Sequence, residues 1–315
     1  MAKAAPIPSL YALKALMAFF VVLTHVSSHY GEYIRPLMCI AVPCFFCITG
    51  FFLYSGDEDE ECRKAWRWIK NAIFLTIWLN LFYYFTKGYI SGCGFKGTSR
   101  GWCILLLQGG NVAPHLWYMT ALWQTLIAFV IARKFFSERL VFLAPFLIVF
   151  SLITGRYSHY ILDGKFSSSW AELSFLFVGI PCMSAGYLIA KYKKTLLQCT
   201  HWGFLFLLGC VLSYVEYAVL EGAGRGGYFL FTLPVSVCLI LMCLETKWVP
   251  WKWLEHIGCR HSANIYYYHM IFVSKGVYAL FGGWLMAPCV FVLSVLLSCV
   301  ICSVKGILRR RVRYS

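Results

Sequence analysis

Long apolar stretches separated by short polar segments run along the whole chain. Ten of them have the length of about 17–22 residues that an α-helix needs to cross a bilayer. They lie at 8–28, 37–55, 68–86, 115–133, 139–155, 170–190, 203–220, 228–246, 262–281 and 284–304. The pattern predicts an all-α, polytopic membrane protein with about ten transmembrane helices. We expect one integral-membrane domain over residues 1–315, without an appended soluble domain.

Composition agrees with this interpretation. The chain is 60% hydrophobic and 13% charged, with a mean hydropathy of +0.69, values that exclude a disordered chain and argue against a soluble globule. The net charge of +15 does not indicate nucleic-acid binding, because the basic residues lie in short clusters between spans and form no such motif. Of the 28 Lys and Arg, 19 fall in one alternating set of connecting segments and seven in the other. By the positive-inside rule, both termini are predicted to be cytoplasmic.

The first apolar stretch carries two ionisable residues, Lys14 and His25. Eleven residues at about 100° each return to nearly the same direction, so the two side chains share a helix face, roughly 16 Å apart. Ionisable groups inside a membrane helix are costly and normally face a protein interior or a wet cavity. The pair therefore marks a candidate functional site, with Lys14 toward the cytoplasm and His25 toward the outside.

Other chemistry-bearing residues fit simpler interpretations. Most of the 15 cysteines lie in apolar spans and behave as small hydrophobes, whereas Cys93 and Cys103 share a predicted external loop compatible with a disulfide. The acidic run at 57–61 is interpreted as a solvated linker. His29 follows His25 at a metal-ligand spacing, but we expect the helix to end near 27–28. We therefore predict no metal site and keep His29 as a residue of the acceptor cleft.

Four motifs then occur in order along the chain. They are a basic-x10-His opening at 14–25, VPCFFCITGFF at 42–52, HLWYM at 115–119 and SANIYYYH at 262–269. A Gly-Ile-Pro at 179–181, followed by Gly186, adds a fifth match. Together they make the chain resemble acyltransferase family 3, integral-membrane enzymes that mostly O-acetylate bacterial surface glycans. The chain departs from the family pattern in carrying Lys14 where Arg is usual and Thr49 where Ser is usual.

The resemblance implies a function in the bacterial inner membrane. It implies transfer of an acyl group, usually acetyl, from cytoplasmic acyl-CoA to a hydroxyl of an extracytoplasmic or lipid-linked glycan. Acyl-CoA is then a co-substrate, and no permanently bound cofactor is expected. His25 is the expected general base, because neutral imidazole with a pKa near 6.5 suits proton removal from a hydroxyl. Lys14 is expected to attract the donor phosphates or to stabilise negative charge on the thioester, although simple snorkelling to the membrane edge is an alternative.

Further candidates have structural alternatives. His115, Trp117 and Tyr118 are candidates for acceptor binding, or they anchor the helix at the interface. His269 is a candidate for the same cavity or a helix-packing contact. The basic residues Arg63, Lys64 and Arg67 are candidates for donor or lipid binding, besides orienting the protein.

Two rival functions remain at this point. A transporter or flippase for a glycan or small anionic solute would use the same polar face, although the paired interrupted helices typical of transporters are not evident. A catalytically silent docking or sensory membrane protein is the third possibility. The sequence carries no signal for the oligomeric state.

Overall fold

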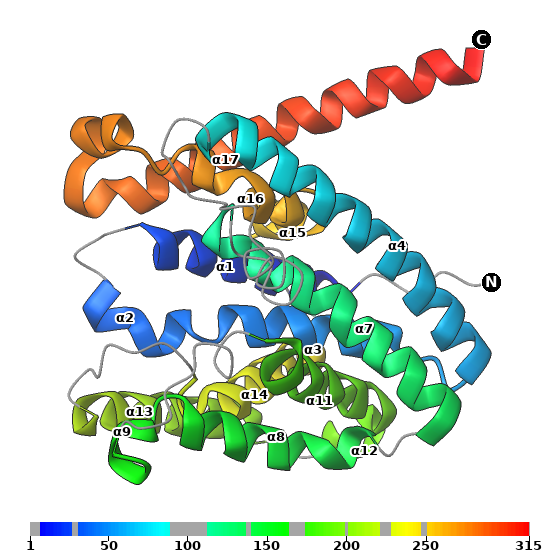
Figure 1. Cartoon of the computed structure of the whole chain (residues 1–315), viewed down its shortest axis with the longest axis vertical. Helices are drawn as coiled ribbons and strands as arrows, with labels where there is room; N and C mark the ends of the chain where they lie inside the picture. The colour runs from blue at the N-terminus through cyan, green and yellow to red at the C-terminus, as the bar shows by residue number, and fades with distance from the viewer. Residues whose placement is uncertain are drawn as a thin grey trace. The chain divides into compact units, whose positions relative to one another are not determined.

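The computed structural model describes residues 7–26, 31–88, 112–136, 140–163, 174–198, 201–220, 228–246 and 251–314. Over these ranges the regular elements are all helices, which confirms the predicted all-α class (Figure 1). Contacts divide the chain into two compact units, one formed by Met1–Ala41 with Cys243–Ser315 and the other by Val42–Met242. Each unit is described by itself.

The first unit joins the two ends of the sequence. Its helices are α1 (Pro8–His25), α2 (Gly31–Met38), α15 (Lys252–Arg260), α16 (Ser262–Tyr268), the 3-10 turn η4 (His269–Ile271) and α17 (Lys275–Tyr314). Pro8 opens α1, a position where the missing backbone N–H costs nothing. The long α17 is broken at Gly282 and Gly283, whose φ angles of 30° and 43° are readily adopted only by glycine.

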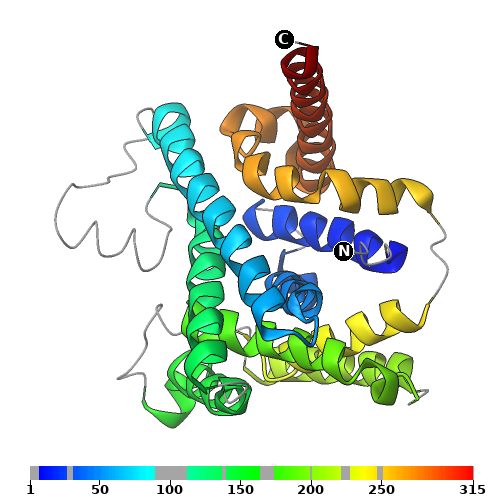
Figure 2. The same cartoon turned by 90° about the vertical axis from the view of Figure 1, so that its right-hand side faces the viewer.

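The second unit holds the middle of the chain. Its helices are α3 (Ala41–Leu53), α4 (Glu58–Tyr83), the π-helical turn η1 (Tyr84–Gly88), the 3-10 turn η2 (Pro114–Leu116), α7 (Trp117–Phe136), α8 (Leu140–Thr154), α9 (Ser158–Ile161), the π-helical turn η3 (Phe175–Gly179), α11 (Ile180–Lys191), α12 (Lys193–Leu196), α13 (Trp202–Val219) and α14 (Thr232–Glu245). The long helices α4 and α7 lie side by side, and α11 packs against α8 (Figure 2).

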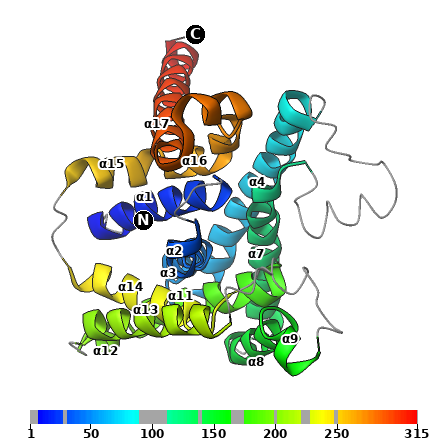
Figure 3. The same cartoon turned by 90° about the vertical axis from the view of Figure 1, so that its left-hand side faces the viewer.

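In the first unit, α1 and the helices α15 and α16 run in parallel. Near the start of α1 and the end of α15, a Cβ on Gly258 would lie 1.6 Å from the carbonyl oxygen of Tyr11, so only glycine fits there. Near their end, the rings of His25 and His269 have centroids 5.3 Å apart. Both chain segments run from the first contact to the second, so they have the same direction. Figure 3 shows α1 and α15 side by side. The close approach at Gly258 therefore holds α15 against α1, and α15 leads into the segment that carries His269.

In the second unit, the motif glycines serve helix packing. A Cβ on Gly50 of α3 would lie 2.0 Å from the carbonyl oxygen of Met183, and one on Gly186 of α11 would lie 1.8 Å from that of Cys47. The two glycines thus allow α3 and α11 to pack backbone against backbone. Thr49 donates its hydroxyl hydrogen to Phe45 O one turn earlier in α3, so the replacement of serine by threonine keeps this bond. Gly50 in the motif at 42–52 and Gly186 after the Gly-Ile-Pro at 179–181 are therefore explained by helix packing.

Four described helices are long and apolar enough to cross a membrane, at Pro8–His25, Tyr33–Leu53, Trp202–Val219 and Gly276–Ile307. Three shorter apolar helices lie at Leu143–Thr154, Phe175–Lys191 and Thr232–Glu245. The chain is therefore a helical membrane protein. The count of ten spans and the side of each terminus stay predictions.

The predicted ninth span, 262–281, was wrong as one continuous helix. The helical path begins at Lys252 with α15, bends at His261 and ends at Ile271, and α17 starts anew at Lys275. Hydropathy missed α15 because it carries Lys252, His256 and Arg260. Packing at Gly258 nevertheless places it along α1, which compensates for its poor hydropathy.

The sequence suggested a solvated linker at 57–61. Asp57, Glu58 and Asp59 are indeed exposed, but the run forms the start of α4 and is not a linker. Asp57 caps the N-terminus of α4 by accepting a hydrogen bond from the backbone N–H of Glu60 at 2.9 Å. Acidic side chains at a helix start are favourable because the helix dipole is positive there. Glu61, at the end of the run, is completely buried.

Candidate active site and other polar clusters

Lys14 and His25 both lie on α1, which is helical without interruption from Pro8 to His25. The eleven-residue spacing therefore does place the two side chains on one helix face. Both side chains are half-buried. The Lys14 ammonium lies 5.9 Å from the centre of the Tyr11 ring, within the range of a cation–π contact.

His25 meets a second histidine at the end of α1. Its ring is tilted by 37° against that of His269, with the centroids 5.3 Å apart. His269 is fully buried, and its Nδ1 lies 2.8 Å from the Tyr266 carbonyl oxygen and 3.1 Å from that of Ile265. Carbonyl oxygens only accept hydrogen bonds, so Nδ1 carries the hydrogen, and Nε2 of the neutral ring has the lone pair. The helix end thus fixes the tautomer and orientation of His269.

The second unit holds the other predicted histidine. His115, in η2, is 1% exposed, and its ring packs edge-on against Tyr83 of α4 with centroids 5.0 Å apart. Trp117 is half-buried at the start of α7. Tyr118 is buried against the Phe46 ring at 4.9 Å. Of these three candidates, Trp117 is the least buried.

The basic residues predicted for donor binding differ in environment. Arg63 and Arg67 are exposed on α4. Lys64 is half-buried, and its ammonium donates a hydrogen bond to Phe52 O at 3.1 Å near the end of α3. A cation at that end is favourable because helix carbonyls point toward it. Lys64 therefore ties α4 to α3, which its sequence context did not reveal.

Some predictions fall on residues outside the described ranges. They are the acceptor-cleft role of His29 and the pairing of Cys93 with Cys103.

A buried ion pair that the sequence did not reveal lies at the start of α4. Glu61 Oε2 is 3.0 Å from Arg133 Nε of α7, and Oε1 accepts the backbone N–H groups of Ser55 and Gly56 at 2.9 and 3.1 Å. The Tyr187 hydroxyl of α11 donates to the same carboxylate at 3.2 Å. The Glu61 carboxylate thus has one guanidinium and three hydrogen-bond donors around it, which indicates a structural role. The sequence did not single out Glu61, because it belongs to a run of five acidic residues.

A second buried carboxylate lies in α13. Glu216 Oε1 accepts the Tyr157 hydroxyl at 2.6 Å and the Leu230 backbone N–H at 2.8 Å. Burial and the hydrogen bond to Glu216 raise the pKa of Tyr157. The Arg156 guanidinium lies over the Phe229 ring at 3.8 Å. The sequence could have indicated this cluster. An acidic residue inside an apolar span costs free energy, so its presence marks a structural or functional role.

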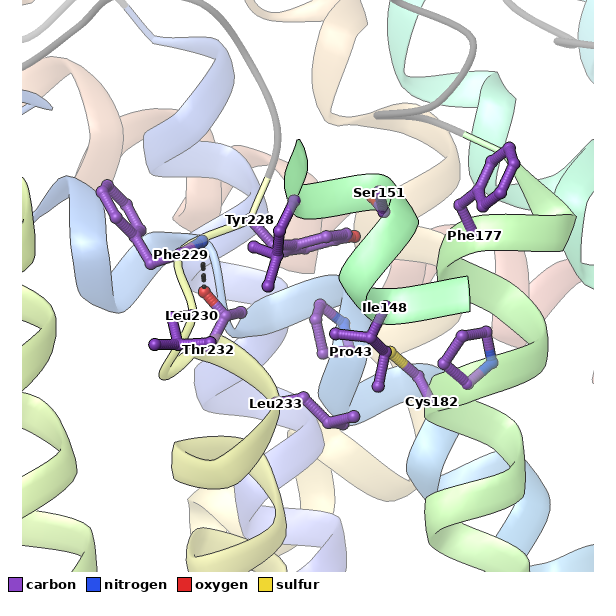
Figure 4. Close-up of a pocket in the computed structure, with 12 residues that line it drawn as sticks. Pro43, Ile148, Ser151, Phe177, Cys182, Tyr228, Phe229, Leu230, Thr232 and Leu233 are labelled. Carbon is purple, nitrogen blue, oxygen red and sulfur yellow. Dashed lines mark hydrogen bonds between the residues drawn. The ribbon is translucent and has the colours of Figure 1, made fainter. Parts of the chain in front are cut away.

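A small cavity lies beside this cluster, between α8, α11 and the segment at 228–233 (Figure 4). Its volume is about 30 Å³, and its walls are mainly apolar, including Pro43 and Pro181 from two of the sequence motifs. The Phe229 backbone N–H donates to Thr232 Oγ1 at 3.0 Å and shapes its rim. A cavity of this size holds one or two water molecules, so it is too small for a sugar.

Comparison with known families decides the broad identity. The model of a family described as an acyltransferase domain, acyltransferase family 3, matches residues 7–303. The chain belongs to acyltransferase family 3. No curated protein and no solved structure gives a significant match. The family assignment predicted from the motifs is confirmed, and it makes this chain a membrane acyltransferase.

Proposed function

We propose that this acyltransferase moves an acyl group, in our expectation acetyl, from cytoplasmic acyl-CoA to a hydroxyl of an extracytoplasmic or lipid-linked glycan. The observation that supports the proposal is the contact of His25 with His269 at the end of α1. Acyl transfer to a hydroxyl needs a base within hydrogen-bonding reach of the attacking O–H. A half-buried imidazole held against an oriented second ring suits that task.

In the proposed reaction, His25 takes the proton of the acceptor hydroxyl as the oxygen attacks the thioester carbonyl. A C–O bond forms, the C–S bond breaks, and the proton passes from His25 to the leaving thiolate. His269 positions the His25 ring, since its own Nδ1–H is held by the carbonyls of Ile265 and Tyr266. Its role is positioning, because nothing in the proposal requires it to touch substrate.

Lys14 supplies positive charge on the same face of α1. We assign it to the donor side, where an ammonium attracts phosphates or the developing charge on the thioester oxygen. Arg63 and Arg67 are exposed and available to the phosphates of CoA or to anionic lipid. Trp117, Tyr118 and His115 stay candidates for acceptor binding, as predicted from the sequence. A bacterial inner-membrane location with ten spans and cytoplasmic termini completes the proposal.

The test is acyl transfer by purified protein with acetyl-CoA and a glycan acceptor. His25→Ala should lower the rate by about 10²–10⁴-fold, the usual contribution of a general base. His201→Ala is the matched control, because His201 is exposed and makes no side-chain cap at the start of α13. Transfer by His25→Ala at the wild-type rate would exclude the mechanism. A transporter would release no CoA in the same assay.

A further inference from the structure

A cysteine and a histidine meet where α15, α16 and α17 come together in the first unit. The Sγ atom of Cys299 lies 3.9 Å from Nε2 of His261, the residue at which the path from α15 to α16 bends. The other ring nitrogen, Nδ1, lies 2.8 Å from the hydroxyl oxygen of Ser298. A nucleophile next to a base that a third group orients is the general arrangement of covalent catalysis.

Ser298 is itself held in place. Its hydroxyl oxygen accepts a hydrogen bond from the side-chain amide of Asn264 at 2.9 Å. A serine oxygen has two lone pairs, so it can accept the His261 Nδ1–H as well. In that arrangement the lone pair of Nε2 faces the thiol of Cys299. Asn264 and Ser298 thus orient the imidazole toward the sulfur.

The base and the nucleophile differ in how deeply they are buried. His261 is 4% exposed and Ser298 is fully buried, whereas Cys299 is exposed. The base is therefore enclosed by protein, whereas the sulfur lies on the outer surface of α17, eight residues before the end of the candidate span Gly276–Ile307. In contrast, Cys44 and Cys182 are buried and behave as core residues.

The same helices connect this pair with Lys14. Gly258 packs against Tyr11 and Ala15 of α1, which lie three residues before and one residue after Lys14. His261 follows Gly258 by about one helical turn, roughly 5 Å along the axis. The thiol therefore belongs to the part of the unit in which the proposed function places the acyl donor. That neighbourhood favours a thioester as its reaction partner.

We propose that Cys299 is a nucleophilic thiol, with His261 as its base, that accepts the acyl group of an acyl-CoA thioester. The inference rests on the proposed function for the identity of the donor. In the step, Cys299 Sγ forms a bond with the thioester carbonyl carbon while its proton moves to His261 Nε2. The C–S bond to CoA then breaks, and the proton passes to the CoA thiolate. One thioester replaces another, so no oxidant or reductant is required.

The experiment incubates the full-length protein in detergent with acetyl-CoA and no acceptor, followed by acid trapping, digestion and mass spectrometry. Wild type should carry one acetyl group on Cys299, and hydroxylamine should remove it because thioesters are labile. Cys299→Ser should abolish the adduct. His261→Gln should slow its formation roughly 100-fold, as expected for loss of a general base.

Cys259→Ser is the matched control. Cys259 is exposed in the same unit, and no hydrogen bond to a histidine is found for it among the described residues. This variant should form the Cys299 adduct at the wild-type rate. Equal acetylation of Cys259 and Cys299 in wild type would show unselective chemistry and overturn the inference. Size-exclusion chromatography of each variant reports its folding.

Alkylation by iodoacetamide without CoA separates this inference from the proposed function. If His261 activates the thiol, His261→Gln should slow alkylation of Cys299 by at least about tenfold and leave Cys259 unchanged. Equal alkylation rates in wild type and His261→Gln would overturn the inference. If Cys299→Ser transfers acetyl to the acceptor at the wild-type rate and wild type forms no adduct, the inference fails while the proposed function stands. Loss of transfer in His25→Ala has no bearing on the adduct.

Discussion

Glu61 and His269 are both completely buried polar residues, but their surroundings differ in kind. Glu61 receives a guanidinium, two backbone N–H groups and a tyrosine hydroxyl, so its charge is neutralised and its oxygens are occupied. His269 has one nitrogen bound to helix carbonyls and one ring face against His25. The first arrangement holds helices together. The second holds an imidazole in a defined orientation beside another titratable group, which is what a catalytic site needs.

The largest effect on stability is expected from breaking the Glu61 cluster. Arg133→Leu leaves the Glu61 carboxylate buried without its cation, so the free energy of unfolding should fall by about 3–5 kcal/mol. Thermal or SDS unfolding in detergent measures the change. The double variant Glu61→Gln with Arg133→Leu should recover part of the loss. Arg63→Leu is the control, because Arg63 is exposed, and an Arg63→Leu loss as large as that of Arg133→Leu would contradict the structural assignment.

A somewhat smaller loss is expected where α15 packs closely on α1. Gly258→Ala places a methyl group into the Tyr11 carbonyl and forces α15 away from α1, costing about 1–3 kcal/mol. The same shift should separate His269 from His25, so transfer activity should fall together with stability. Gly276→Ala is the control, since a Cβ there meets nothing within 4 Å. Wild-type stability of Gly258→Ala would show that the helices pack differently.

The histidine pair itself should respond in activity. His269→Gln removes the oriented ring beside His25 and should lower kcat about tenfold with KM nearly unchanged, because a positioning residue acts on the chemical step. Transfer kinetics with acetyl-CoA at several concentrations measure both constants. A purely structural role for His269 would instead lower the amount of folded protein and leave kcat of the remainder intact.

The smallest effect is expected at the second buried carboxylate. Tyr157→Phe deletes the hydroxyl that Glu216 accepts at 2.6 Å, which should cost about 1–3 kcal/mol at most, and nearer 1 because the Leu230 N–H remains. Tyr160→Phe is the exposed counterpart in α9. If the two variants unfold at the same temperature, the Glu216 contact contributes little to stability.

Much of the helical architecture followed from local pattern. The apolar windows at 115–133, 139–155 and 203–220 nearly coincide with α7, α8 and α13, because a run of apolar residues of that length is stable in a bilayer only as a helix. The motif order likewise predicted the family that the match over 7–303 confirmed. The polar helix α15 did not follow, because its stability comes from packing on α1 and not from its own hydropathy.

The candidate site, like the fold, was predictable from the sequence only in part. The alignment of Lys14 with His25 was predictable, since helix periodicity is a property of a single segment. The partners of polar residues were not: Glu61 with Arg133 and Cys299 with His261 are separated by long stretches of chain. Helix periodicity depends on neighbours in sequence, so the residue order alone settles it. Which polar groups meet inside the protein depends on how helices pack, and only the folded chain decides that.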